Sequence, residues 1–245
     1  MTEAARADQP RTSGDAADVD TIELLALVAH LQHVAFGRLA EDAAAAPHVA
    51  QQLELSRLAA AAVVRRDRVL ARVTELGGDP EARIGAYAEL LDDFDSRTQP
   101  STWWERLLRS YVAEGVSDDF CRIAAGAVDE RSRVLLTEVL DDAAHAELAV
   151  AELESAGSQD AVLVSRLALW GRRLAGEALG VVQQALAGHP ALVRLVNRPA
   201  AGGSADAAVT GAGAPAGTAD EAAPRLFGEL TAEHTRRMSR LGLTA

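Results

Sequence analysis

The amino-acid sequence predicts an all-α fold. Hydrophobic residues make up 49% of the 245 residues, whereas aromatic residues make up only 4%. Alanine and leucine dominate the apolar positions, and Val, Ile, Tyr and Thr do not gather into the alternating runs that are typical of strands. The first long segment, residues 20–46, instead repeats its apolar residues at the spacing of one helix face. We therefore expect helices packed around a core.

The charge and cysteine content disfavour several classes of partner. The net charge is −12 and every fixed cation is an arginine, so nucleic acid, including metal-independent RNA binding, is disfavoured. The single cysteine, Cys121, rules out an internal disulfide and fits a reducing compartment. The start of the chain does not resemble a secretory signal, and uninterrupted apolar runs stay well below the ~20 residues of a membrane span. We expect a cytoplasmic protein with no membrane partner.

The first part of the chain predicts a helix pair. Residues 1–19 are polar and small, and we expect a disordered tail. The tetrapeptide DTIE at 20–23 is an Asp variant of a capping box, which places the start of the first helix at Asp20 and its end near Ala46. Pro47 then begins a second helix that ends at the two glycines 77–78.

A second helix pair follows a long connection. Residues 79–100 are too many for a tight hairpin and predict a crossover with one short helix. The capping box TWWE at 102–105 opens the third helix, and a fourth helix ends near Ala156. Two helix pairs joined by a long crossover form the ferritin-like arrangement, a four-helix bundle.

The remaining sequence predicts additions to this bundle. A fifth helix over 160–187 completes a domain that we place at residues 20–198. Residues 199–223 are rich in Gly, Ala and Pro and predict a flexible linker. A last helix, 224–245, is expected to dock on the bundle through Leu226, Leu230 and Met238, with His234 on an exposed charged face.

The second helix pair nearly matches a metal-binding template. A carboxylate-bridged di-iron site needs a Glu from each of two helices and a Glu-x-x-His from each of the other two. Glu114 and Asp142 lie equally far along the sequence before and after Val128, so an antiparallel hairpin that turns there brings them to one level. His145 follows Asp142 by three and shares its helix face, and Glu138 is a further candidate ligand one turn earlier.

The first helix pair lacks the corresponding ligands. With Pro47 as the turn, Gln32 and Ala62 lie at matching positions before and after it. The template requires a carboxylate at position 32, Glu at position 62 and His at position 65. The chain has Gln32, Ala62 and Arg65 instead, so this half supplies none of its three ligands. We therefore predict a degenerate di-iron site without a cofactor.

Four segments carry a resemblance to a known family: AHLQHVAFGRLAEDA, TQPSTWWERLLRSYVAEGVSDDF, EVLDDAAHAELAV and LFGELTAEHTRRMSRLGL. They resemble actinobacterial ferritin-like proteins grouped with the tRNA-modifying di-iron hydroxylase that acts on 2-methylthio-isopentenyladenosine. The resemblance covers roughly residues 20–156 and 225–243. It implies a four-helix core with added C-terminal helices, and ligand roles for Glu114, Asp142 and His145.

Two interpretations of these residues remain open at the sequence level. In the first, Arg65 replaces the metal beside Glu114 and Asp142, with Gln32 bonded to the cluster. In the second, Arg65 is a surface arginine whose stem covers apolar area, and the carboxylates and His145 form a solvated helix face.

The predicted function is a non-catalytic, metal-free relative of the hydroxylases, with no catalytic residue assigned. It would serve as a binding or assembly module whose partner is an unknown protein or a second copy, as in a homodimer. The alternative is an active non-haem di-iron oxygenase that uses iron with Glu114, Glu138, Asp142 and His145.

Overall fold

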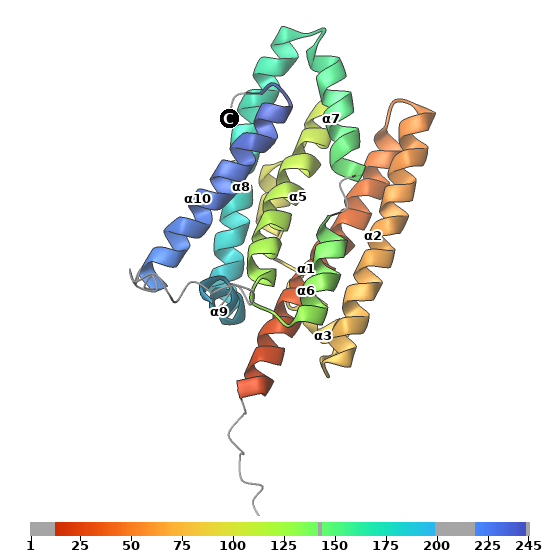
Figure 1. Ribbon diagram of the computed structural model, residues 1–245. Coiled ribbons are helices and arrows are strands. Elements are labelled where there is room, and N and C mark those ends of the chain that lie inside the picture. The colour runs from red at the N-terminus through yellow and green to blue at the C-terminus, as the bar shows by residue number, and fades with distance from the viewer. Residues whose placement is uncertain (1–12, 142–143, 199–218, 244–245) are drawn as a thin grey trace, which may run out of the picture.

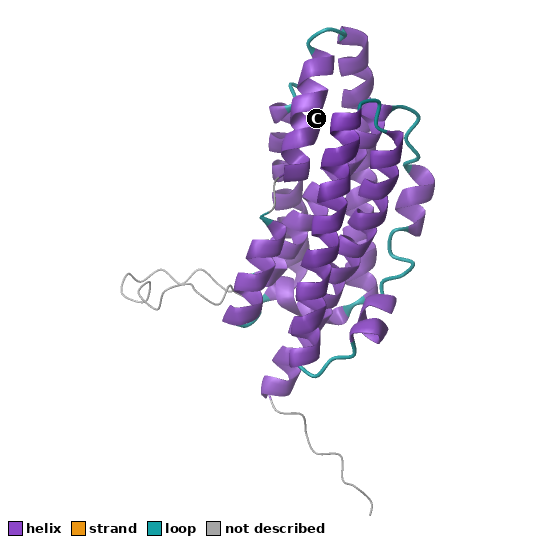
Figure 2. Ribbon diagram, turned by 90° about the vertical axis from the view of Figure 1, so that its right-hand side faces the viewer, coloured by secondary structure: helices purple, strands orange, loops and turns teal. Residues whose placement is uncertain are grey.

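The computed structural model describes residues 13–141, 144–198 and 219–243 (Figure 1). Every regular element within these residues is a helix, as the colouring by secondary structure shows (Figure 2). The all-α prediction is confirmed. The predicted ligand Asp142, positions 1–12 of the predicted tail and most of the predicted linker lie outside the described residues.

Ten helices span the described part of the chain. They are α1 (Ser13–Ala45), α2 (Val49–Glu75), α3 (Pro80–Gly85), α4 (Asp92–Arg97), α5 (Trp103–Ala125), α6 (Glu130–Leu140), α7 (Ala144–Gly157), α8 (Ala161–Gly188), α9 (Pro190–Asn197) and α10 (Ala219–Arg240). The hairpin α1–α2 packs against α5 and the pair α6–α7, which together make the four-helix core. Helices α8, α9 and α10 cover α5, so α2 and α10 lie on opposite sides of it (Figure 1).

The structure contains one of the two capping boxes that the sequence predicts. At the start of α5, the Thr102 hydroxyl accepts a hydrogen bond from the Glu105 N–H, and the Glu105 carboxylate accepts one from the Thr102 N–H, each at 3.2 Å. The capping box predicted at Asp20 is wrong, because α1 begins at Ser13 and runs through it. Asp20 is buried inside the fold and pairs with Arg194 and Arg198.

Two predicted elements are each divided in the structure. The crossover holds two short helices, and Asp79 caps the first by accepting hydrogen bonds from the N–H groups of Glu81 and Ala82. The predicted fourth helix consists of α6 and α7. Where α6 ends, the Arg122 guanidinium donates to the Leu140 carbonyl, which supplies the partner that a continuing helix would have given.

Helix α1 is longer than predicted, and it is more apolar overall than its short uninterrupted apolar runs indicate. Its segment Ala16–Ala45 is sufficient in length and composition to cross a membrane. However, 67% of its most apolar window is buried inside the bundle, where α2, α3, α5 and α9 contact the helix. Such burial is typical of a core helix.

The apolar core has two parts. The larger part contains Ile22 and residues 24–29 of α1 together with the buried faces of α5, α8 and α10. The smaller part lies at the far end of the α1–α2 hairpin and is built of alanine and leucine, including Leu39, Leu55 and Ala62. The stretch LAAAA at 58–62 therefore serves close packing against α1. Between the two clusters, both helices carry polar residues.

Two glycines allow α10 to approach the core closely. A β-carbon at Gly115 of α5 would overlap the Arg237 guanidinium, and one at Gly171 of α8 would overlap the end of Met238. Leu226, Leu230 and Met238 are buried in the large cluster. The helix begins at Ala219, before the predicted start, and Pro224 lies inside it.

His234 is buried on α10, whereas the sequence indicated an exposed face. Its exposed fraction is 5%, and neither ring nitrogen has a hydrogen-bond partner in the described structure. Burial, followed by the charge of Arg237, lowers the pKa of His234 to about 4. An unpartnered buried polar group costs about 1–3 kcal/mol, so His234 opposes the docking of its own helix.

We predict that His234→Leu raises the free energy of unfolding by about 1 kcal/mol at neutral pH, because it removes this unpartnered ring. Between about pH 6.5 and 4 the unfolded chain binds a proton that the folded His234 does not bind, so wild-type stability falls as pH falls. The variant should lose less stability over this window in urea titrations. His30, whose pKa is also lowered to about 4, leaves part of the dependence in place.

The matched control is His33→Leu, because His33 is exposed on α1. Its stability and acid dependence should stay close to those of the wild type. The prediction is wrong if both substitutions change stability to the same extent, or if His234→Leu loses as much stability in acid as the wild type.

Candidate functional site

A layer of polar side chains crosses the bundle between the two apolar clusters. Helix α1 supplies Gln32, α2 supplies Arg65, α5 supplies Glu114 and α7 supplies His145. The large cluster uses α1 as far as Ala29 and α2 from Val69, whereas the small cluster uses α1 from Ala35 and α2 as far as Ala62. The polar layer occupies the turns between these limits.

Glu114 and His145 form a hydrogen-bonded pair across α5 and α7. The His145 Nδ1 lies 2.8 Å from the Glu114 Oε2. Burial acts to lower the pKa of His145, but the charge and hydrogen bond of Glu114, together with the charge of Asp42, outweigh it and raise that pKa. Burial acts to raise the pKa of Glu114, but His145, Arg38 and Arg65 outweigh it and lower that pKa. Both shifts favour the pairing of an imidazolium with a carboxylate, in which the Nδ1–H donates to Glu114.

Arg65 and Gln32 form the corresponding contact across α1 and α2. The Arg65 Nε donates to the Gln32 Oε1 at 2.8 Å. The charge of Arg65 contributes to lowering the pKa of Glu114 and opposes protonation of His145. A cationic guanidinium thus acts on the Glu114–His145 pair from the opposite half of the bundle.

The other predicted site residues lie elsewhere or outside the description. Ala62 is fully buried in the small apolar cluster, where it packs between α1 and α2. Glu138 is exposed and pairs with Arg68 on the surface of α2, so it does not join the polar layer. Asp142 lies outside the described residues. The structure thus brings Gln32, Arg65, Glu114 and His145 into one layer and leaves Glu138 out of it.

A buried carboxylate that the sequence analysis missed lies on α1 beyond this layer, beside the small apolar cluster. Asp42 of α1 accepts a hydrogen bond from Arg106 at 3.0 Å and one from the Ser110 hydroxyl at 3.5 Å. Burial raises the pKa of Asp42, although Arg106 opposes this. The signal that could have revealed it is on α5, where polar residues at 106, 110, 114 and 118 recur at every fourth position and share one face.

A small cavity adjoins the layer. It has a volume of about 40 Å³, and its polar lining includes Gln32, Arg38, Glu114 and Asp118. This volume is sufficient for one or a few water molecules. Burial, followed by the charge of Glu114, raises the pKa of Asp118 to about 7. Chemically, the layer can hold protons and a few waters beside fixed guanidinium groups.

Comparison with protein families agrees with this architecture. The family model described as a ferritin-like domain of actinomycetes matches residues 15–199. The chain belongs to this ferritin-like family. A search of curated proteins gives no significant match.

The donor set of this ferritin-like domain does not fit a carboxylate-bridged pair of metal ions. Such a centre takes ligands from all four core helices. Here α1 and α2 present an amide at Gln32, a methyl at Ala62 and a guanidinium at Arg65. A guanidinium has no lone pair to offer a metal and repels a cation. Within the described residues, His, Cys, Asp and Glu side chains do not gather in groups of three or more that could hold a metal ion.

We predict that Glu114→Gln destabilises the protein most in mild acid. The raised pKa of His145 stabilises the fold below about pH 6.5, and this contribution is lost as pH rises through the folded pKa. The lowered pKa of Glu114 stabilises the fold above about pH 4.5, and this is lost as pH falls through its folded pKa. The variant should lose about 2 kcal/mol at pH 5.5 and less at pH 9.

Urea unfolding at the two pH values measures this difference, and NMR titration should show the His145 pKa falling below about 6.5 in the variant. Glu138→Gln is the control, because its surface ion pair with Arg68 is worth less than about 1 kcal/mol. An unchanged pKa of His145 in Glu114→Gln would contradict the proposed charge state of the pair.

Proposed function

We propose that this ferritin-like protein is a non-catalytic, metal-free relative of the di-iron tRNA hydroxylases and acts as a binding or assembly module. The observation that supports this proposal most directly is the Arg65 guanidinium, which is bonded to Gln32 and whose charge reaches Glu114 and His145. In a di-iron relative, metal ions would supply the positive charge at this level of the bundle.

The physical argument rests on charge compensation. A buried carboxylate is costly without a cation, and Glu114 finds one in protonated His145 and others in Arg38 and Arg65. A guanidinium stays charged at all ordinary pH values and has no redox chemistry. These cations offset the charge of Glu114, although the Glu114 Oε1 and the His145 Nε2 are buried without a hydrogen-bond partner in the described structure. The first half of the bundle lacks the bridging carboxylates that two iron ions require.

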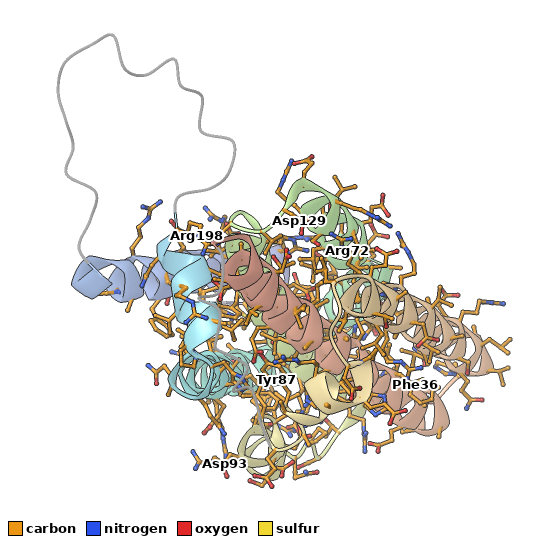
Figure 3. All side chains as sticks on the ribbon, turned by 90° about the horizontal axis from the view of Figure 1, so that it is seen from below. Phe36, Arg72, Tyr87, Asp93, Asp129 and Arg198 are labelled. Carbon is orange, nitrogen blue, oxygen red and sulfur yellow. The ribbon has the colours of Figure 1, made fainter. Side chains whose placement is uncertain are left out.

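The surface of the α1–α2 hairpin supports a binding role. Four large apolar side chains are exposed there, namely Phe36, Val49, Leu53 and Val64. Phe36 lies at the side of the hairpin, away from α9 (Figure 3). Exposed apolar groups on one hairpin favour contact with a protein partner, either an unknown protein or a second copy.

The alternative is an active di-iron oxygenase that binds iron through Glu114, Glu138, Asp142 and His145. The surface ion pair of Glu138 with Arg68 weighs against it. Metal content separates the two functions. We predict that protein purified after growth in iron-rich medium contains far less than one iron per chain. Stoichiometric iron with an oxo-bridge absorption band would support the oxygenase instead.

The variant Gln32→Glu/Ala62→Glu/Arg65→His restores the template residues and provides a positive control. We predict that this variant gains affinity for Fe²⁺ or Co²⁺ and that these ions raise its melting temperature. Each ion would neutralise the carboxylates that the substitutions introduce. Arg68→His is the matched control, because Arg68 is exposed on the same helix. If the restored variant takes up no more metal than this control, these positions do not form a vestigial site.

A further inference from the structure

A groove separates α10 from α5 and α7. Its volume is about 390 Å³, which lies in the range of small-molecule sites. The buried side chains of Tyr111 and His145 contribute to it from the core side together with Gly115, and Leu140 and Ala146 add apolar surface. Helix α10 contributes charged residues near its C-terminal end to the other side of the groove. The groove therefore combines a buried floor with a charged rim, which is a common arrangement for a ligand site.

The charge of the groove differs from that of the whole chain. The protein has 24 arginines against 36 acidic residues. The described residues that line the groove instead include as many arginines as acidic residues. Its arginines are Arg122, Arg236, Arg237 and Arg240, and its acidic residues are Glu114, Asp118, Asp141 and Glu233. The described lining of the groove is therefore less acidic than the chain as a whole.

The ion pairs around the groove leave one of its arginines, Arg240, without a carboxylate partner among the described residues. Arg122 pairs with Asp119 and Asp141, Arg237 pairs with Asp119, and Arg236 pairs with Glu233. Arg240 is exposed at the rim and makes no ion pair with the described residues, and its positive charge acts on the buried Tyr111. The second terminal nitrogen of Arg237 is buried and has no hydrogen-bond partner in the described structure. An exposed guanidinium group without a carboxylate partner, such as that of Arg240, favours an anionic ligand.

Arg237 is held in position before any ligand arrives. A β-carbon at Gly115 would overlap its guanidinium, so only glycine lets this side chain lie against the backbone of α5. The carboxylate of Asp119 fixes its other terminal nitrogen. A cation that is already ordered loses little conformational entropy when it meets a ligand.

We propose that this groove binds a small organic anion, a carboxylate or a phosphate monoester. Its charged group would meet Arg240 at the rim near Arg237, and its apolar body would pack on Leu140, Ala146 and the Tyr111 ring. The inference deepens the proposed function by naming a ligand class for a binding module. The proposed anion site shares Glu114 and His145 with the polar layer, but anion binding does not depend on the metal content of the protein.

Isothermal titration calorimetry of the full-length protein tests this proposal. Phenyl phosphate and benzoate are the anionic probes, and benzyl alcohol is the neutral analogue. We expect saturable binding of at least one anion that weakens as sodium chloride rises, and no saturable binding of the alcohol. Saturation by phenyl phosphate alone assigns a phosphate ligand, and saturation by benzoate alone assigns a carboxylate.

The variant Arg240→Gln should bind the anion about tenfold more weakly. Its matched control is Arg225→Gln, an exposed arginine on the same helix that pairs with Glu229 and does not line the groove. Equal effects of the two variants, or no saturable binding of either anion, would overturn the proposal. Iron in the purified protein would contradict the proposed function but would leave this titration interpretable.

Discussion

The structure depends on how charge is balanced in the layer between its two apolar clusters. Glu114 is largely buried there and must meet positive charge, which His145 supplies through a hydrogen bond and Arg38 and Arg65 supply at longer range. Arg65 in turn is anchored by Gln32 on the first helix. Because these partners come from α1, α2, α5 and α7, the charge balance fixes the relative position of both halves of the bundle.

Much of this arrangement follows from counting residues outward from the helix turns. The counts place Gln32 at the level of residues 62–65 and Glu114 at the level of the segment that carries His145. The structure has a hydrogen bond within each of these pairs. The count succeeds because an α-helix rises by a constant amount per residue, about 1.5 Å, and because both connections are short. Periodicity and constant rise also explain why the helical fold was predictable.

Other features depend on partners far away in the sequence, which local patterns do not contain. Asp20 has the sequence context of a helix cap, but Arg194 and Arg198 give it charge partners inside the fold, and the helix continues through it. The exposure of His234 was wrongly predicted because its charged neighbours indicated a solvated face. Helix α10 instead places Arg237 and Met238 against glycines 115 and 171, which lie in other helices.

The polar layer and the groove have two residues in common, so charges in one half of the bundle act on the groove in the other half. Glu114 and His145 line the groove, and Arg65 helps to set their protonation from the other side. With a metal at this level, the His145 nitrogen would be a neutral ligand. In this chain Glu114 acts to raise the pKa of His145 and Arg65 acts to lower it, so the charge on this side of the groove depends on both halves of the bundle. A substitution on α2 therefore alters the electrostatic surface that a ligand between α5, α7 and α10 would meet.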